Sequence, residues 1–297
     1  MPSEIVALLT DFGYRDPFVG MMKGVMVGIN PALQLIDISH EISPQRIREA
    51  ALVLSVTYRY FAPGTIFVVV VDPGVGGARR PLVAETPDHR FVAPDNGVLD
   101  PVLDQATVRR VIHATNAQYF RVPVSQTFHG RDVFAPLAAW LSRGVDAGAM
   151  GSRIDDYVRL QLSSPGVHAD GTLEGEVIYQ DRFGNLITNL SESWLAERWG
   201  AAPWQGVVVE LGTSVVRGLD AYYGQRAPNE LGLIMNSWGL LEIFANGGHA
   251  GQSIGAGEGS RLRIRRQASE ERSARSGARQ SRASDAYRPR HRLHHDA

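Results

Sequence analysis

Four side chains stand out because their types and surroundings could support chemistry. Asp11 and Asp72 each follow an apolar run, Arg79 lies one short loop beyond Asp72, and His129 precedes a helix-like pattern. A carboxylate can accept hydrogen bonds from a vicinal diol such as that of ribose, and an arginine can hold a polar group beside it. A neutral imidazole near the positive end of a helix dipole can accept a proton. These residues indicate diol binding and proton transfer.

Each of these residues also has a simpler structural explanation. Asp11 could cap the following helix. Asp72 could belong to an ordinary Asp-Pro-Gly turn, with Arg79 and Arg80 as a solvated pair. His129 could simply hydrogen-bond a nearby loop. Taken one by one, the residues leave these alternatives open.

The elements that must position these residues alternate between strand and helix patterns. Ser43 and Pro44 suit the N-cap and first residue of the second helix. The uniformly apolar run at 65–71 is typical of parallel strands covered on both faces. Because parallel sheets bind ligands at the carboxyl ends of their strands, Asp11 and Asp72 should lie at one edge. The predicted strands are residues 5–10, 33–38, 65–71, 91–93 and 108–113, and the predicted helices 19–29, 44–58 and 133–141.

The second half has a different pattern of short strands separated by turns that contain Gly and Asn. These strands, at 173–179, 186–190, 207–211, 231–235, 240–245 and 261–264, indicate a small β-barrel or sandwich. The predicted fold class is therefore α/β, with a mostly parallel α/β sandwich domain and a smaller C-terminal β-barrel-like domain. The predicted boundaries are 1–150 for the first domain, 151–171 for a linker, 172–266 for the second domain and 267–297 for a disordered tail rich in Arg, Ser and His.

Composition narrows the class of protein. The 297 residues are 44% hydrophobic and 21% charged, with a net charge of -1, as in an ordinary soluble domain. Cysteine is absent, which excludes disulfides, a thiol nucleophile and thiolate-bound metals. No apolar run approaches the ~20 residues of a membrane span, and the first residues lack a signal-peptide pattern, so we expect a cytoplasmic protein.

Charge and missing motifs limit the partners further. The chain has one lysine, Lys23, among 30 basic residues, and its tail from Gln267 carries seven arginines against four acidic residues. We expect no nucleic-acid binding beyond a weak contact by this tail, for which a solubilising extension is the favoured explanation. A phosphate-binding Gly-Lys-Ser/Thr loop and metal-type histidine pairs are missing. We therefore expect neither a metal nor a cofactor.

The motifs as a set closely resemble the S-adenosylmethionine hydrolase family, which is related to fluorinating and chlorinating enzymes. The resemblance covers roughly residues 4–266, and its motifs occur at residues 9–24, 72–76, 93–97, 128–134, 181–185 and 236–239. It implies that water cleaves S-adenosylmethionine, the substrate, into adenosine and L-methionine. Asp72, Arg79 and His129 match the residues that hold the attacking water, and Asp11 matches the residue that binds the ribose hydroxyls.

The resemblance also implies substrate contacts in the second domain and a homotrimer whose site lies between that domain and the first domain of a neighbouring subunit. Trp238 departs from the halogenating branch, which has an arginine there, so the partner of the methionine carboxylate is open. A halide-dependent halogenase and a non-catalytic adenosine or S-adenosylmethionine sensor are the alternatives. The matching substrate-binding positions are Asp181, Phe183, Asn185, Ser237, Glu242 and Ala245.

Overall fold

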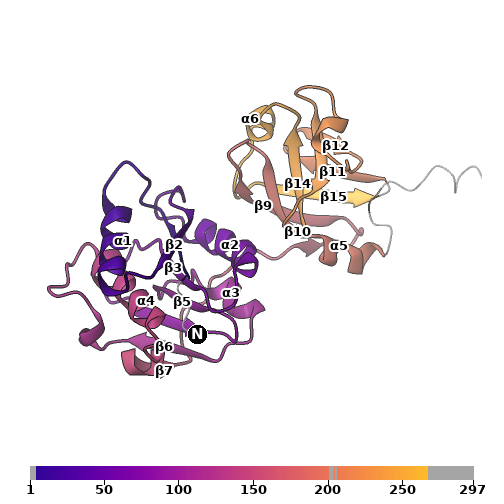
Figure 1. The fold of residues 1–297 in the computed structure, drawn as a ribbon. Helices are drawn as coiled ribbons and strands as arrows, with labels where there is room; N and C mark the ends of the chain where they lie inside the picture. The colour runs from indigo at the N-terminus through magenta and orange to yellow at the C-terminus, as the bar shows by residue number, and fades with distance from the viewer. Residues whose placement is uncertain (1–4, 201–203, 205, 267–297) are drawn as a thin grey trace, which may run out of the picture. The chain divides into compact units, whose positions relative to one another are not determined.

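Two units, which divide after Leu162, make up the chain in the computed structural model (Figure 1). The structure describes residues 5–200, 204 and 206–266, so the predicted tail lies outside the described residues. The predicted linker at 151–171 contains two short strands. One of them, β7 (Gly151–Ile154), pairs with a strand of unit 1, and the other, β8 (Gly166–Val167), pairs with a strand of unit 2.

Unit 1 is built on a seven-stranded sheet with the strand order β2-β1-β3-β5-β4-β6-β7. The pairings β1–β2, β1–β3 and β3–β5 are parallel, as the apolar runs predict, and the remaining pairings are antiparallel. The α/β class with a parallel-containing sheet is thus confirmed, and three of the six pairings in this sheet are parallel. Besides β7, the strands are β1 (Ile5–Thr10), β2 (Gln34–Ser39), β3 (Ile66–Val70), β4 (Pro81–Glu85), β5 (Arg90–Pro94) and β6 (Arg110–Ala114).

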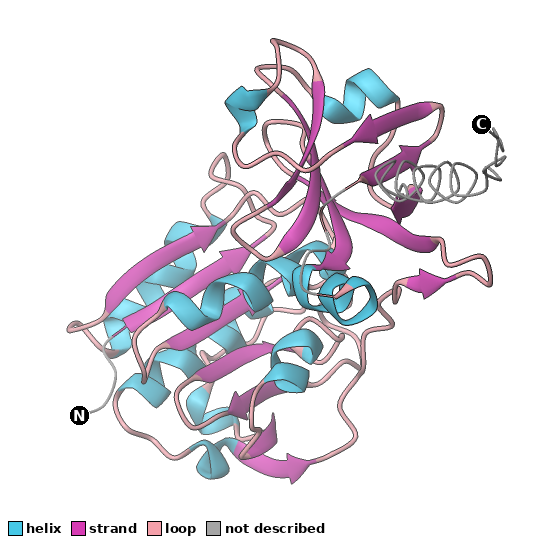
Figure 2. Ribbon diagram, turned by 90° about the vertical axis from the view of Figure 1, so that its right-hand side faces the viewer, coloured by secondary structure: helices cyan, strands magenta, loops and turns pink. Residues whose placement is uncertain are grey.

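Helices cover both faces of this sheet (Figure 2). A hydrophobic core lies on each face. Successive side chains of a strand point to opposite faces, so Val6 and Leu8 enter one core and Ala7 and Leu9 the other. The first core is closed by α1 (Phe18–Ile29) and α4 (Ala135–Ser142). The second is closed by α2 (Ile47–Thr57) and α3 (Asp100–Gln105). Both faces are covered, which explains why β3 is apolar at every position.

The start of α2 differs from the prediction. The helix begins at Ile47 after Arg46, so Ser43 is not its N-cap. Instead, the backbone N–H of Ser43 donates to Oε2 of Glu49 over 3.2 Å. The intervening Gln45 has a φ of 65°, which a helix cannot accommodate. This backbone conformation costs energy, and a hydrogen bond from the backbone N–H of Gln45 to a residue of the candidate site helps to stabilise it.

Unit 2 is an antiparallel sheet that curls toward a barrel. Its strands follow the order β12-β11-β15-β9-β10-β14-β13, and β12 and β13 at the two ends lie next to each other. Besides β8, its elements are β9 (Leu173–Gln180), β10 (Leu186–Ser191), β11 (Val207–Leu211), β12 (Ser214–Arg217), β13 (Leu231–Met235), β14 (Leu240–Ala245), β15 (Arg261–Arg266), α5 (Glu192–Trp199) and α6 (Ala250–Ile254). The barrel-like second domain is confirmed.

None of the helices that the structure describes is long and apolar enough to cross a membrane.

Candidate active site

The carboxyl edge of the parallel strands gathers the polar residues of unit 1. Asp11 follows β1 directly, His40 follows β2 directly, and Asp72 comes two residues after β3. Because these three strands are parallel neighbours, their carboxyl ends meet at one edge of the sheet. This is the edge at which open α/β sheets bind ligands.

Asp72 and Arg79 form a tight ion pair within the loop that follows β3. Nε of Arg79 lies 2.9 Å from both carboxylate oxygens of Asp72, and its Nη2 lies 2.5 Å from Oδ2. Only 5% of the Asp72 side chain and 10% of the Arg79 side chain are exposed. The guanidinium also lies over the Phe134 ring, 5.2 Å from its centre. Arg79 is therefore not part of a solvated arginine pair.

His129 extends this ion pair into a chain of three residues. Nη2 of Arg79 lies 2.6 Å from Nδ1 of His129. A guanidinium has no acceptor, so Arg79 must donate and Nδ1 must carry the lone pair. Burial, together with the positive charge of Arg79, holds the pKa of His129 below its ordinary value of 6.5. The neutral ring therefore carries its proton on Nε2.

The local backbone explains how His129 and the loop after β3 are brought together. His129 immediately precedes a single π-helical segment, Gly130–Phe134, that runs into α4. Across from it, Gly76 has a φ of 76°, and a Cβ at this position would lie 2.2 Å from the carbonyl oxygen of Gln126. A glycine is required here, because the two loops approach each other too closely for any side chain.

Asp11 binds the strained turn before α2 rather than a helix end. Its Oδ2 accepts the backbone N–H of Gln45 over 2.8 Å. The helix α1 begins only at Phe18, after Pro17, and has no side-chain cap, so the capping explanation for Asp11 is wrong. Burial raises the pKa of Asp11, and the negative charge of Asp72 raises it further. The two carboxylates thus lie near enough to influence each other.

In unit 2, Asp181 organises the loop between β9 and β10. Its Oδ1 accepts the backbone N–H groups of Phe183 and Asn185, each over 2.9 Å, and its Oδ2 accepts Nδ2 of Asn185 over 2.9 Å. Asn185 is buried, whereas 74% of Phe183 is exposed. An exposed phenylalanine on a rigid turn offers a flat apolar surface to a ligand.

Glu242 lies buried on β14 and pairs with two polar groups. Its Oε1 accepts the Tyr223 hydroxyl over 3.0 Å, and its Oε2 accepts Nδ2 of Asn236 over 3.1 Å. Burial raises the pKa of Glu242, and the charge of Asp181 contributes. Burial and the neighbouring Glu242 raise the pKa of Tyr223 to about 12. The carboxyl of Glu242 is therefore within the electrostatic reach of the Asp181 loop.

The remaining predicted residues of unit 2 lie on the hairpin formed by β13 and β14. Ser237 is exposed in its turn, and Ala245 ends β14. Trp238 packs against Tyr179, with ring centres 5.6 Å apart. Asn236 fixes the turn, because its Oδ1 accepts the backbone N–H groups of Trp238 and Leu240.

Sequence reasoning missed Tyr223 and His40, which contact predicted site residues or the loops that carry them. Tyr223 lies in a loop that precedes β13, and its bond to Glu242 joins residues 19 positions apart. The aromatic pair Tyr222 and Tyr223 beside Gly224 was the available signal in the sequence. His40 stands at a strand end, which was the same signal that identified Asp11 and Asp72.

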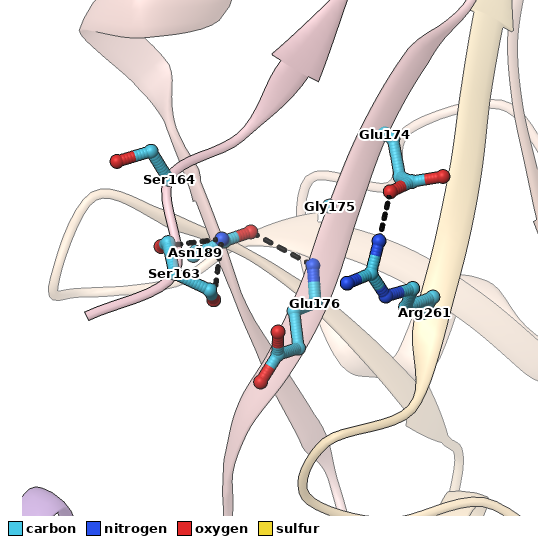
Figure 3. Close-up of a pocket in the computed structure, with 7 residues that line it drawn as sticks. All are labelled: Ser163, Ser164, Glu174, Gly175, Glu176, Asn189 and Arg261. Atoms are coloured by element: carbon cyan, nitrogen blue, oxygen red, sulfur yellow. Dashed lines mark hydrogen bonds and ion pairs between the residues drawn. The ribbon is translucent and has the colours of Figure 1, made fainter. Parts of the chain in front are cut away.

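A separate hollow in unit 2 does not include any of these residues (Figure 3). It holds about 40 Å³, too little for a nucleoside. Its polar groups satisfy one another: Nδ2 of Asn189 donates to the carbonyl oxygen of Ser163 over 3.0 Å, and Arg261 donates to Glu174 over 2.6 Å. Within the described ranges, no group of three or more His, Asp or Glu side chains is placed to hold a metal ion.

This fold and this arrangement define a two-unit protein of α/β plus β-barrel type, with a polar chain of carboxylate, guanidinium and imidazole at the sheet edge. Two family models identify the family within this class. The N-terminal domain model of the SAM hydroxide adenosyltransferases matches residues 6–151, and their C-terminal domain model matches residues 175–263. The chain belongs to the SAM hydroxide adenosyltransferase family.

Individual relatives and a solved structure agree with this membership. The chain is 34% identical to an (R)-S-adenosyl-L-methionine hydrolase from Salinispora tropica, over 89% of this chain and 98% of the relative. It is 26% identical to a fluorinase from an Actinoplanes species, over 63% of this chain and 71% of the relative. The crystal structure of an uncharacterized conserved protein from Thermotoga maritima matches with a TM-score of 0.82 and 37% identity, over 88% of this chain and 100% of that one.

Proposed function

We propose that this protein hydrolyses S-adenosyl-L-methionine to adenosine and L-methionine. The observation that carries the proposal is the hydrogen-bonded chain from Asp72 through Arg79 to His129, at the ligand-binding edge of the sheet. All three residues of the hydrolase pattern are present, and Arg79 contacts the other two. The 34% identity to a curated hydrolase over 98% of that protein's length supports the same reaction.

The chemistry needs little from the protein besides orientation. A water oxygen forms a bond to the ribose C5′ while the C5′–S bond breaks. The electron pair of the C5′–S bond moves to sulfur. The leaving group is a neutral thioether, so it needs no acid. The water loses one proton, and the sulfonium charge disappears. A partly desolvated site favours such a loss of charge, and an in-line position of the water supplies much of the rate.

The hydrogen bonds assign different roles to the three residues. Nδ1 of His129 is occupied by Arg79, so the Nε2–H can donate to the water oxygen and orient it. Oδ2 of Asp72 accepts two hydrogen bonds from Arg79, whereas Oδ1 accepts one and keeps acceptor capacity, so Asp72 is the candidate acceptor of the water proton. Arg79 fixes the relative positions of the other two residues. These steps require neither a metal nor another cofactor.

The remaining predicted residues would bind the substrate. Asp11 accepts the ribose hydroxyls, because a carboxylate oxygen can accept a further hydrogen bond beside that from Gln45. Phe183 and Asn185, held by Asp181, bind the adenine side. Ser237, Glu242 and the backbone at Ala245 line the methionine end and the adenine, as the family resemblance implies.

The proposal includes a homotrimer in the cytoplasm, with each site formed by unit 1 of one subunit and unit 2 of its neighbour. The family resemblance supports this assembly, and the cysteine-free composition is consistent with a cytoplasmic protein.

Product analysis with each resolved sulfonium epimer tests the reaction. We expect equal amounts of adenosine and methionine from the (R) epimer, the form named for the curated relatives, in the presence of a chelator and without halide. In ¹⁸O-labelled water, the label should appear in the 5′-hydroxyl of adenosine. A protein that left the substrate intact but formed 5′-halo-5′-deoxyadenosine with chloride or fluoride would be a halogenase instead.

A first prediction separates the hydrolase from a non-catalytic sensor. Replacing Asp72 or His129 by Ala removes the proton acceptor or the water-orienting group, so turnover should fall about 10²–10⁴-fold. Adenosine binding, measured by calorimetry, should change little, because neither residue is assigned to the nucleoside. Equal, slow rates for the wild type and both variants would identify a sensor.

A further inference from the structure

A fully buried histidine lies beneath the loop that carries Asp11, and the proposed reaction does not use it. His40 is 0% exposed, and its Nδ1 lies 2.7 Å from Oγ1 of Thr10, which is also 0% exposed. Thr10 ends β1 and immediately precedes Asp11. The Thr10 hydroxyl also accepts the backbone N–H of Phe12 over 3.3 Å, so its own proton is free to be donated to Nδ1.

The other side of the His40 ring faces Asp37 on β2. Nε2 of His40 lies 3.1 Å from Oδ1 of Asp37, although the two atoms do not meet the geometry of a hydrogen bond. Both atoms are buried and have no other hydrogen-bond partner among the described residues. Burial opposes the charge of Asp37, but Lys23 and His40 hold its pKa below the ordinary value. A ring proton on Nε2 thus faces a charged carboxylate.

The loop after Asp11 rests on these same two residues. The backbone N–H of Gly13 donates to the carbonyl oxygen of His40 over 2.7 Å. The Tyr14 ring meets the His40 ring edge-on, with centres 5.1 Å apart, and the Tyr14 hydroxyl donates to Oδ2 of Asp37 over 3.1 Å. Contacts with His40 and Asp37 therefore hold residues on both sides of Asp11.

Asp37, His40 and Thr10 have the side-chain types of a hydrolytic triad, but burial excludes a nucleophilic role. The Thr10 hydroxyl lies inside the unit, and its one proton is donated to His40 while it accepts from Phe12. A substrate carbon could not reach it without unfolding the end of β1. The arrangement can instead fix a backbone position.

We propose that His40 is a positioning residue, which joins Thr10 to Asp37 and thereby holds Asp11 in place to recognise the vicinal diol of ribose. The inference rests on the proposed function, because it takes Asp11 as the residue that binds the ribose. Two bonds to one diol need a carboxylate in a fixed orientation, and a loop that loses its support no longer provides this. Loss of His40 should weaken recognition of the diol more than recognition of adenine.

Two variants each keep one of the two side-chain contacts of His40 and lose the other. The amide of His40→Asn can still accept from Thr10 but does not reach Asp37, whereas that of His40→Gln can reach Asp37 but not Thr10. The experiment measures the dissociation constants of adenosine and of 2′,3′-dideoxyadenosine, which lacks the diol. The ratio of these constants does not depend on the fraction of protein that is folded.

We expect the wild type to prefer adenosine at least about tenfold, and both His40 variants to lose most of this preference. Their KM for S-adenosylmethionine should rise about tenfold while kcat changes less. The matched control is His89→Gln, since His89 is also buried in unit 1 but packs among the rings of Tyr58, Phe67 and Phe91. This control should keep the wild-type ratio.

Three results would overturn the inference: a wild-type ratio in both His40 variants, an equal loss in the His89 variant, or a wild type that does not distinguish the two nucleosides. Failure of the proposed function has a different signature. A wild-type protein that prefers adenosine over the dideoxynucleoside but releases no adenosine from S-adenosylmethionine would lack the reaction and still permit the His40 test.

Discussion

Among single residues, Arg79 is the one that joins a carboxylate and an imidazole into one site. Its Nε and Nη2 face Asp72 while Nη2 also reaches His129, and the guanidinium packs on Phe134. A planar group with several donors can make these contacts at once, whereas an ammonium acts from a single point. The shape of this side chain, and not its charge alone, therefore allows both contacts.

Arg79→Lys should consequently impair the reaction although the charge is kept. We expect kcat to fall about 100-fold, because one ammonium cannot hold Asp72 and orient His129 together. Arg80→Lys is the matched control, since Arg80 binds Asp95 and Asp156 instead. Steady-state kinetics of both variants test this, and equal losses in the two would show that the shape of Arg79 is unimportant.

The lowered pKa of His129 predicts the acid limb of the pH–rate profile. Above pH 6.5 the ring is neutral and Nδ1 accepts from Arg79. As the pH falls through the lowered pKa, Nδ1 gains a proton and both groups become donors, so the chain breaks. We expect kcat/KM to remain level near neutral pH and to fall only below pH 6.5, as the pH passes through the lowered pKa of His129.

His129→Asn provides the control for this profile, because its amide oxygen can accept from Arg79 and does not titrate in this range. The variant should be slower and should lack the limb assigned to His129. An unchanged acid limb in the variant would assign it to another group, such as Asp11, whose pKa is raised by burial.

At the level of elements, the loop between β3 and β4 depends on a close backbone approach. Gly76→Ala places a Cβ 2.2 Å from the carbonyl oxygen of Gln126, at a φ of 76°. Gly144 has a φ of 87° but open space around its Cβ position, so Gly144→Ala carries the conformational strain alone, about 1 kcal/mol. We expect Gly76→Ala to lower both the melting temperature and kcat by more.

Thermal unfolding and kinetics of the two glycine variants check this prediction. Similar melting temperatures with equal kcat would mean that the loops separate without consequence. A loss of kcat confined to Gly76→Ala would show that the approach of the two loops sets the position of Arg79.

The sequence predicted long, strongly patterned elements well and short ones poorly. The apolar run at 65–71 identified β3 within a residue at each end, since burial on both faces leaves a clear pattern. In contrast, β4 begins with Pro81 and β7 holds one large apolar residue, Ile154, so neither resembled a strand. Both strands form because neighbouring strands offer unpaired backbone groups, which a local pattern cannot show.

The same limit applied to the candidate site. Asp11 and Asp72 follow predicted strands, so topology alone placed them at one edge. The direct contact between Arg79 and His129 joins residues 50 positions apart, and their family motifs, not local patterns, linked them. The contact of Asp11 with Gln45 depends on a left-handed backbone conformation that was not predictable from the residue type.

For the whole molecule, the candidate residues fall into two sets, one in each unit. Asp72, Arg79, His129 and Asp11 belong to unit 1, whereas Asp181, Asn185 and Glu242 belong to unit 2. If the proposed site forms between subunits, neither set is sufficient within one chain. Two inactive variants, one substituted in unit 1 and the other in unit 2, should then regain activity when they assemble together.

Asp72→Asn and Asn185→Ala should each be strongly impaired as separate homotrimers. Co-expressed in equal amounts, they should regain about a quarter of wild-type activity, because most trimers would be mixed and each would hold one intact site of three. Activity of the purified co-expressed protein, with mixed and unmixed trimers together, measures this. Recovery no greater than the average of the two parents would place both sets of a site within one subunit.

Because lysine is nearly absent from the chain, the contact between Lys23 and Asp37 can be modified selectively by chemical labelling. Lys23 is the single lysine of the chain, its side chain is 30% exposed, and its Nζ lies 2.7 Å from Oδ2 of Asp37. An amine-directed fluorophore has this one side-chain target, beside the carboxylate that faces His40. Acylation would remove the positive charge that Asp37 relies on, whereas reductive methylation would keep it. Chemical labelling of Lys23 could therefore report on the loop that carries Asp11 without any mutation.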